Sequence, residues 1–475
     1  MKRIIINSIF AVIIILFFAA DSFAQTASDA LRLSETGLGS NARALGMGNS
    51  YQSLSDDFSA ASFNPAGFGF LKRMEFAGGI NYSKFNNNTT FLGNTTDYSN
   101  SATNLDQISF AFPFPTMRGS LVFAVGYNKD KDFNGAVNFN GFNNGNTSMI
   151  QALQGIGDVP YLLYLTDSSG NTDIAGRLNQ EGTIISKGNI GRWSFSGAVE
   201  MARNVFVGGT LNIISGTYER TRDYYEDDTR NVYGSNFLTD PANARTADFQ
   251  SFYFNDILNW DISGWDAKVG FIYQFNRLVR LGASIKFPTK YTIKEDYTVN
   301  GKSEFANQTY TVDPPLESKV EYEITTPYQF SGGASVNYKG LILSGDLTYI
   351  DYSQTEFSSG LSASDMSANN KDIRELFKGV LNYNVGAEYT IPDINIRVRG
   401  GFILNPSPYK GDPSERDKKY LTGGIGFLAD EAFAFDIAYA YGWWKDIGDN
   451  YSANVSRTYQ DVNYNNLIFT VSYRF

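Results

Sequence analysis

The chain ends in the stretch LIFTVSYRF, residues 467–475, in which side-chain character alternates from one residue to the next. One face of an extended strand would carry Leu467, Phe469, Val471, Tyr473 and Phe475. The opposite face would carry Ile468, Thr470, Ser472 and Arg474. A period of two residues is typical of a β-strand whose two faces meet different surroundings. The stretch therefore predicts a strand with one apolar face and one mixed face.

The same alternation recurs at residues 193–201, 279–287, 383–391 and 433–441. In most of these stretches one face is large and apolar, whereas the other is small or charged. The outer face of a soluble sandwich usually carries long polar side chains. A face rich in Gly, Ala and Ser suits a crowded barrel lumen better than open solvent.

Fourteen strand candidates follow one another from residue 74 to residue 475, the second covering only residues 105–112. Short joins fall at residues 113–118, 202–204, 276–277, 339–340, 392–393 and 429–431, and long polar joins at 143–181, 225–250, 359–373 and 445–459. Short turns at one end and long loops at the other are the layout of outer-membrane barrels. We therefore predict an all-β fold, a transmembrane antiparallel β-barrel of about 14 strands. The N- and C-termini then both lie on the short-turn side, in the periplasm.

The composition supports this fold. The 475 residues have a mean hydropathy of −0.26, yet 15% of them are aromatic. Barrels combine these properties because only every second strand residue meets lipid. Aromatic residues gather where strand candidates end, at Trp443 and Trp444, Tyr349 and Tyr352, and Tyr473 and Phe475. We interpret them as interface girdles, with the strand propensity of aromatic residues as the alternative.

Cysteine and histidine are both absent from the sequence. Their absence excludes disulfides, thiolate nucleophiles, Ser-His-Asp triads and zinc sites built from these residues. The net charge of −10 disfavours nucleic acid as a partner. We predict no enzyme activity, no cofactor and no metal, with an outer-membrane hydrolase as the alternative. The cluster Glu226-Asp227-Asp228 could bind Ca²⁺, but a solvated outer loop is the commoner explanation.

The first residues have the features of a secretory signal. Lys2 and Arg3 precede a nearly all-apolar run, and Ser22-Phe23-Ala24 forms a cleavage site before Gln25. We predict a signal peptide at residues 1–24, with an uncleaved anchor helix as the alternative. Residues 25–73 do not alternate, and we assign them to a separate segment before a barrel at residues 74–475. We expect a monomer in the outer membrane of a Gram-negative bacterium, in contact with its lipid and lipopolysaccharide.

Residues 39–71 read GSNARALGMGNSYQSLSDDFSAASFNPAGFGFL and contain the triplet Asn64-Pro65-Ala66. This run resembles the N-terminal hatch of the FadL/TodX family of outer-membrane transporters for long-chain fatty acids and other hydrophobic compounds. Residues 280–293 and 326–354 resemble further parts of that family. The resemblance implies a fourteen-stranded barrel with a small plug at residues 25–73. It also implies passive uptake in which plug movement couples ligand binding to a lateral exit.

Three groups of residues could carry this transport. Asn64, Pro65, Ala66 and Gly67 could form a rigid gate, because proline fixes φ and asparagine can bond its own backbone. The loop at residues 147–165 could capture the ligand through Met149, Ile150, Leu153, Ile156, Leu162 and Leu163, or could simply pack its own core. Inward cations could bind a carboxylate head group, namely Lys268, Arg280, Lys286, Arg397 and Arg399. The alternative for these cations is ion pairing with Glu200, Asp346, Glu388 and Asp436.

The charged run Lys129-Asp130-Lys131-Asp132 interrupts the third strand candidate. A kink there would open the barrel wall, whereas the charges could instead mark where the strand leaves the membrane. Two other functions stay open at this point. One is a general polar pore, against which an internal plug argues. The other is a family-related structural or secretion-associated barrel.

Overall fold

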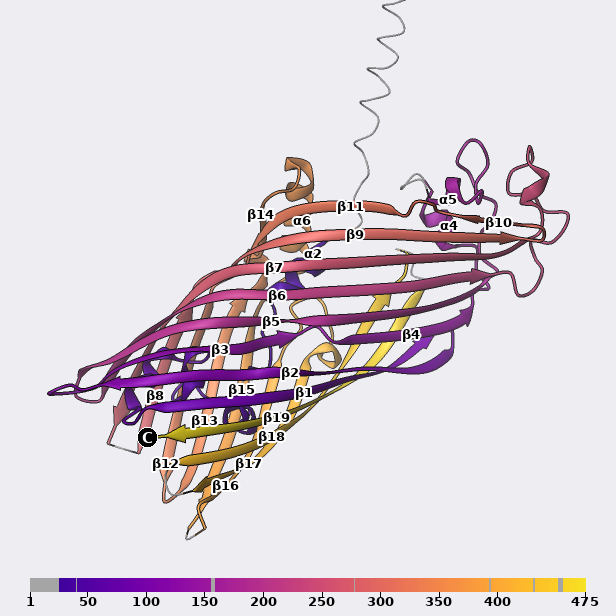
Figure 1. Cartoon of the computed structure of the whole chain (residues 1–475). Coiled ribbons are helices and arrows are strands. Elements are labelled where there is room, and N and C mark those ends of the chain that lie inside the picture. Colours follow the sequence, from indigo (N-terminus) through magenta and orange to yellow (C-terminus); the bar gives the residue numbers. More distant parts are fainter. Residues whose placement is uncertain are drawn as a thin grey trace, which may run out of the picture.

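The computed structural model describes residues 25–39, 41–154, 159–276, 278–392, 394–429, 432–451 and 456–475. Its strands form one antiparallel sheet that closes on itself (Figure 1). The closure is made by β1 (Glu75–Phe91), which pairs on one side with β2 (Asn94–Phe114) and on the other with β19 (Arg457–Arg474). The predicted closed antiparallel barrel is therefore confirmed.

Several of the strands are successive parts of one crossing of the barrel. These are β3 (Leu121–Asp132) with β4 (Gly135–Phe142), β8 (Val279–Lys286) with β9 (Lys290–Phe305), β10 (Gln308–Thr311) with β11 (Leu316–Thr325) and β12 (Gln329–Tyr338), and β13 (Leu341–Asp351) with β14 (Glu356–Ser359). The other strands are β5 (Asn179–Ala202), β6 (Val205–Asp227), β7 (Phe249–Phe275), β15 (Gly379–Ile391), β16 (Ile396–Asn405), β17 (Lys418–Ala429) and β18 (Phe433–Asp449). Counted by crossings, the described part of the chain forms a 14-stranded barrel, as predicted.

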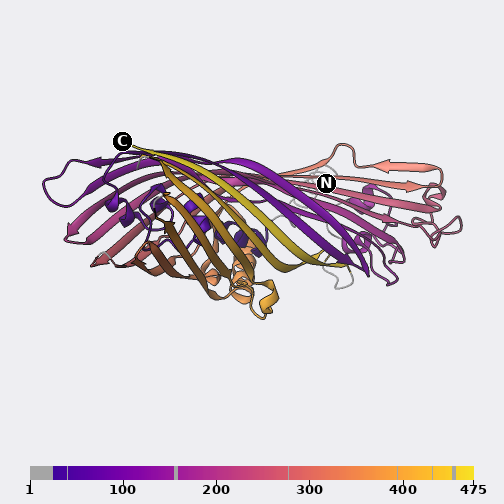
Figure 2. The same ribbon diagram turned by 90° about the horizontal axis from the view of Figure 1, so that it is seen from below.

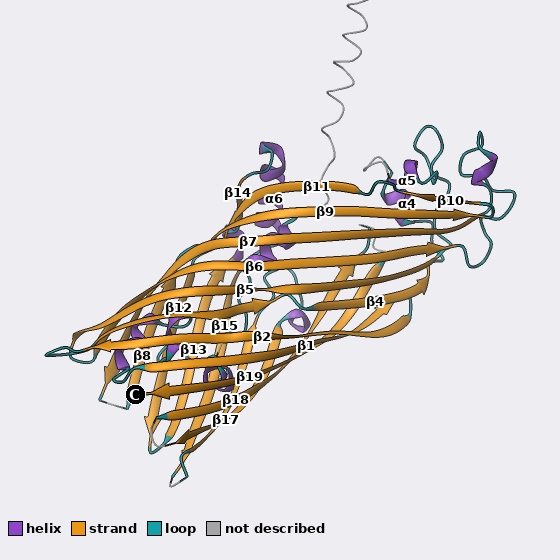
Figure 3. Ribbon diagram, viewed as in Figure 1, coloured by secondary structure: helices purple, strands orange, loops and turns teal. Residues whose placement is uncertain are grey.

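Helices occur in the N-terminal segment, residues 25–73, and in the loops (Figure 3). The N-terminal segment contains α2 (Ala27–Ser34), α3 (Ala42–Gly46), η1 (Phe58–Ala61) and η2 (Pro65–Phe70). The loops contain α4 (Met149–Ala152), α5 (Val159–Leu162), η3 (Ala244–Thr246), α6 (Ala363–Leu376) and η5 (Ser414–Arg416), whereas η4 (Tyr352–Gln354) lies between β13 and β14. Over the described residues, each helix is too short or too polar to cross a membrane.

The two ends of the barrel differ as expected. At one end, β5 and β6 are joined by residues 203–204 only, and β12 and β13 by residues 339–340. At the other end, residues 143–178 lead from β4 to β5 and residues 228–248 lead from β6 to β7. One join at the loop end is nevertheless tight, because Leu92 and Gly93 both adopt positive φ and turn β1 directly into β2.

The second strand is therefore much longer than the predicted residues 105–112, since β2 begins at Asn94. Its first half, residues 94–104, is rich in Asn, Thr and Ser. Such a strand carries no apolar alternation, which is the signal on which the sequence-based boundary relied.

The outward phase of the membrane-facing strands is as predicted. Phe433, Phe435 and Ile437 of β18 are 41–45% exposed, whereas Ala438 and Ala440 are buried inside the barrel. Outward aromatic residues at strand ends are consistent with a girdle. The girdle prediction is wrong for two residues, because Tyr352 is buried and Trp444 packs against inward aromatic rings.

Strand length differs strongly around the barrel. β5, β6 and β7 have 24, 23 and 27 residues, whereas β12 and β16 have ten each. A transmembrane strand needs only about 9–11 residues, so the long strands continue well beyond the membrane. Figure 2 shows this extension reaching far past the short strands. Its inner face carries buried aromatic residues, which α4 and α5 cover.

The lipid-facing phase makes a stability prediction. Ile437→Arg should lower the free energy of unfolding by about 2–4 kcal/mol, because Ile437 faces outward about midway between Phe433 and Trp443, so an arginine there would face the acyl chains near the middle of the bilayer. Denaturant unfolding in lipid vesicles measures this change. Thr95→Arg is the matched control, since Thr95 is exposed at the far end of β2. Equal stability of the two variants would contradict the assigned membrane position.

Candidate functional site in the barrel lumen

The N-terminal segment lies inside the barrel with its backbone directly against the wall. A Cβ atom at Gly270 of β7 would lie 2.0 Å from Oδ1 of Asn64. A Cβ atom at Gly386 of β15 would lie 2.1 Å from the carbonyl oxygen of Met47. Inward glycines of the strands thus form a surface that the segment fits at backbone distance. This contact explains the small residues on the inner faces.

Asn64, the first predicted gate residue, joins the segment to two strands. Its side-chain oxygen accepts a hydrogen bond from the backbone N–H of Ala66 at 3.2 Å. Its side-chain nitrogen lies within hydrogen-bond distance of the carbonyl oxygens of Gln52 at 2.8 Å, Phe271 at 3.1 Å and Ala283 at 3.3 Å. The residue is fully buried, so these bonds replace water.

The other gate residues build the turn that Asn64 caps. Pro65 and Ala66 begin η2, where proline at the first helical position has no backbone N–H to satisfy. Only glycine fits at position 67, since a Cβ atom there would lie 1.7 Å from the carbonyl oxygen of Ser55. The four residues therefore form one rigid turn fixed to the wall.

The five predicted head-group cations all lie on the strands that surround this segment. Lys268 donates to the carbonyl oxygens of Ser62 and, at 3.4 Å, Phe63. Lys286 lies 3.2 Å from the carboxylate of Asp266, which is fully buried. Both lysines thus have protein partners, and they line a polar cavity of about 120 Å³ together with Arg192.

Arg399 is the centre of a buried ion-pair network. Its guanidinium lies 2.6 Å from Glu388 and 2.5 Å from Asp436, two of the carboxylates named as alternative partners. Arg43 of α3 binds both oxygens of Glu388 at 3.0 Å and also contacts Asp56 at 2.6 Å. The network therefore fastens the N-terminal segment to β15 and β16.

Arg280 and Arg397 lie beside the same network. Arg280 is 3.8 Å from Asp56, and its guanidinium lies 4.0 Å from the ring centroid of Phe70. Burial alone would raise the pKa of Asp56, but the charges of Arg43 and Arg280 hold it below its usual range. Arg397 is half-buried on β16, two residues before Arg399. The two remaining expected carboxylates bind backbone N–H groups: Asp346 that of Gln52 and Glu200 that of Asn204.

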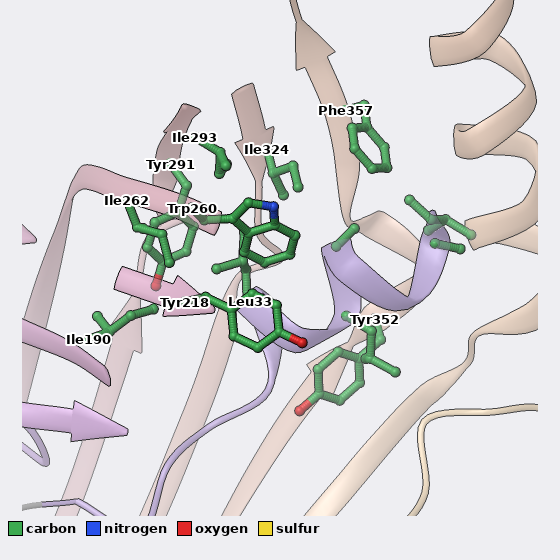
Figure 4. Close-up of a cluster of buried hydrophobic side chains, with 14 of the residues drawn as sticks. Leu33, Ile190, Tyr218, Trp260, Ile262, Tyr291, Ile293, Ile324, Tyr352 and Phe357 are labelled. Atoms are coloured by element: carbon green, nitrogen blue, oxygen red, sulfur yellow. The ribbon is translucent and has the colours of Figure 1, made fainter. Parts of the chain in front are cut away.

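Helix α2 occupies the apolar part of the lumen. Its residues Ala27, Ala30, Leu31 and Leu33 pack among inward aromatic and aliphatic side chains of the long strands. Figure 4 shows Leu33 beside Tyr218 and Trp260, with Ile293 and Ile324 close by. We call the apolar α2 residues and the strand side chains packed around them the α2 cluster. A ligand that used this apolar surface would have to displace the helix.

The third strand is broken where the charged run lies. β3 ends at Asp132, β4 begins at Gly135, and the register against β5 shifts between Lys129 and Lys131. Both lysines are buried and point inward. Nζ of Lys131 binds the carbonyl oxygens of Arg32, Leu33 and Glu35 at 2.7–2.9 Å, and so caps the end of α2. The two lysines therefore have their partners inside the barrel, and the charged run lies at a break in the strand.

The wall is less regular next to this break. The ladder between β2 and β3 joins Gln107–Phe114 to Leu121–Asn128. Beyond it, side chains bridge the strands, and Asn189 of β5 bonds Asn104 of β2 at 3.3 Å across the end of β3. A cavity of about 280 Å³ lies behind the break, lined by aromatic residues and by Lys131 and Asp132.

Most of the predicted capture residues lie in the core of the extension. Met149, Ile150, Leu153 and Leu163 are buried under the loops, whereas Leu162 is 41% exposed. Ile156 lies outside the described residues. Met149 and Leu153 also line a cavity of about 510 Å³ between the loops and the long strands. We call it the outer cavity.

The outer cavity combines apolar walls with arginines that the sequence analysis did not single out. Phe254 and Tyr297 line it together with Arg220 and Arg222 of β6. Both arginines bind the fully buried Asp256, Arg220 at 2.8 Å. Within the described residues, Nε of Arg220 has no hydrogen-bond partner. The cavity thus combines apolar surface with two arginines, and the buried Nε of Arg220 is an unused donor.

The acidic cluster does not form a cation site. Glu226 is fully buried and accepts hydrogen bonds from the backbone N–H groups of Met149 at 2.7 Å and Ile150 at 3.3 Å. Asp228 accepts from the backbone N–H groups of Val232 and Tyr233. The expectation of a solvated loop is therefore wrong for Glu226, whose carboxylate holds the start of α4.

A closed barrel that holds its own N-terminal segment and carries an apolar band outside defines a plugged membrane channel. The family described as outer membrane protein transport protein (OMPP1/FadL/TodX) matches residues 194–475, more than half of the chain. The chain therefore belongs to this family of bacterial outer-membrane transport channels, which are not enzymes. No curated protein sequence matches significantly.

Solved structures show the same fold at low sequence identity. The toluene transporter TodX of Pseudomonas putida is 12% identical, with 92% of this chain and 99% of TodX covered and a TM-score of 0.58. A Pseudomonas aeruginosa FadL homologue is 12% identical, with 93% and 98% covered and a TM-score of 0.55. The toluene transporter TbuX of Ralstonia pickettii is 16% identical, with 92% and 98% covered and a TM-score of 0.51.

The glycine contacts make a prediction about the N-terminal segment. Gly270→Ala should force Asn64 from the wall, at a cost of about 1–3 kcal/mol for each buried polar group left unpaired. Hydrogen exchange across residues 41–73 should become faster, while the barrel stays heat-modifiable. Gly209→Ala is the control, because a Cβ atom there meets only the carbonyl oxygen of Lys268 at 3.8 Å. Unchanged exchange in Gly270→Ala would contradict this contact.

Proposed function

We propose that this chain carries hydrophobic molecules with an acidic head group, long-chain fatty acids above all, passively across the outer membrane. The observation that carries the proposal is the outer cavity, where apolar side chains and the paired arginines Arg220 and Arg222 line one space. Each CH₂ group buried there would contribute about 0.8 kcal/mol. A carboxylate would accept charge-assisted hydrogen bonds from the arginines.

The charge balance around this cavity supports an anionic ligand. Arg220 and Arg222 share Asp256, and Arg457 lies 3.4 Å from Asp449, which lines the cavity. The charged residues of the lining and the side chains paired with them thus include three arginines and two aspartates. TodX and TbuX are toluene transporters. An uncharged aromatic hydrocarbon would use the apolar walls but would have no need of the excess positive charge.

We propose that the ligand passes from the outer cavity along the α2 cluster to the break between β3 and β4. Lys131 supports this route, because it touches both the break and the end of α2. Movement of α2 would then couple ligand binding to a lateral exit. In this orientation the loops face outward, and the short-turn end, where Glu75 pairs with Arg474, faces the periplasm. Packing of the N-terminal segment against the wall argues against a general polar pore.

The head-group part of the proposal is tested by Arg220→Gln. Uptake of a long-chain fatty acid at low concentration should fall roughly tenfold, because a hydrogen bond to a charged group contributes about 1.5–3 kcal/mol. Asp256 keeps Arg222 as its partner, so the fold should persist. The measurement is uptake into cells or liposomes, with a fatty alcohol of equal length for comparison.

The alcohol should enter Arg220→Gln at nearly the wild-type rate, because it makes no use of the cation. Lys187→Gln is the matched control, since Lys187 is largely exposed on β5. An equal loss for acid and alcohol would mean that Arg220 acts on the fold and not on the head group.

The lateral exit is tested by closing the wall with a reversible cross-link. The natural chain has no cysteine, so Asn104→Cys with Asn189→Cys introduces one defined pair. Linking these two positions should block uptake, and reduction of the link should restore it. The control pair is Asn140→Cys with Glu181→Cys, whose side chains already bond at 2.7 Å between paired strands. Full uptake through the linked Asn104–Asn189 pair would exclude this exit.

A further inference from the structure

The carboxylate of Glu295 in β9 lies in the α2 cluster and is almost fully buried. One oxygen accepts hydrogen bonds from Nε1 of Trp260 at 2.9 Å and from the hydroxyl of Tyr322 at 2.9 Å. The other accepts from Nε2 of Gln25 at 2.5 Å. All three donors are neutral groups.

Within the described residues, Glu295 takes part in no ion pair, and the basic side chains of α2 and of its own strand have other partners. Arg32 of α2 binds Asp29 of the same helix. Lys294 points to the opposite face of β9 and lies 3.9 Å from Glu321. A carboxylate that leaves water without a counter-ion is costly, so a cation beside Glu295 would stabilise its charged form.

The sequence supplies such a cation at the required place. Gln25 follows the predicted cleavage site Ser22-Phe23-Ala24. Hydrolysis of the bond between Ala24 and Gln25 consumes one water and leaves a carboxylate on Ala24 and an ammonium on Gln25. The side chain of the same glutamine already touches Glu295, so its backbone nitrogen is only a few bonds away. We propose that the ammonium group created by signal-peptide cleavage is the counter-ion of Glu295, and that this pair anchors α2 in the lumen.

The position of Gln25 makes the pair an anchor for the whole helix. Thr26 is the N-cap of α2, and its side chain and backbone bond the Asp29 carboxylate in a capping box. The start of the helix is therefore rigid up to the residue that carries the ammonium. In the unprocessed chain the same nitrogen is a neutral amide, so the Glu295 site is complete only after cleavage. Processing and occupation of the lumen by α2 are thereby linked.

The test measures the reactivity of the N-terminal amine in purified full-length mature protein. An amine-reactive reagent is added at neutral pH to the folded protein in detergent, and mass spectrometry follows the N-terminal peptide. The wild-type amine should react slowly, because it is protonated and buried. Glu295→Gln should react about tenfold faster or more, since the charge that holds the ammonium is gone. Glu321→Gln is the matched control and should behave as wild type, because Glu321 is largely exposed.

Three results would overturn the inference. Equal reactivity of wild type and Glu295→Gln is one. A mature chain that begins at another residue is the second, and a Gln25 cyclised with loss of ammonia is the third, because neither has an ammonium at Gln25. If Glu295→Gln loses heat-modifiability, a Gly-Ser insertion between Ala24 and Gln25 replaces it. That insertion keeps Glu295 but moves the ammonium away, and an unchanged reactivity would overturn the inference. Uptake is not the readout, so failure of the transport proposal would be seen separately.

Discussion

The structure depends on contact between two backbones, that of the N-terminal segment and that of the barrel wall. Side chains normally keep a strand and an inserted peptide apart, but at Gly208, Gly270 and Gly282 nothing stands between them. Close approach lets the Asn64 side chain bond carbonyl oxygens of β7 and β8 directly. The absence of side chains at these glycines therefore determines which segment can fill the lumen.

Buried ion pairs set the position of the N-terminal segment against the barrel wall. Arg43, Glu388, Arg399 and Asp436 form a chain of buried pairs between α3 and the wall. Buried ion pairs add little to stability, because desolvation offsets their attraction, but breaking one by removing a partner is costly. We infer that the network fixes the position of the segment more than it strengthens the barrel. Of the predicted head-group cations, Arg399 belongs to this network, and Lys268 and Lys286 have other partners inside the barrel. The outer arginines are therefore better placed for a ligand.

The sequence predicts the barrel well and the site only in part. The alternation of side chains predicts the outward face of β18, because a strand has a period of two residues. The lengths of the joins predict which end of the barrel carries the loops. Neighbouring residues of a strand face opposite sides, so Trp443 and Trp444 could never share one girdle. Arg220 and Arg222 lie in the inward phase of Tyr218 and Tyr224, and extending that phase would have found them. Arg43 has no such signal, because α3 has only five residues and its partners come from distant strands.

The break in the third strand joins these features into one device. Lys131 could have bonded a carboxylate, but it binds three carbonyl oxygens at the end of α2, where the helix dipole favours a cation. Asp130 of the same run binds Arg192, which lines the polar cavity with Lys268 and Lys286. A shift of α2 therefore cannot leave the break unchanged, since the lysine that stabilises the helix end belongs to the strand that is interrupted. The position of the helix and the continuity of the wall are set by the same few bonds.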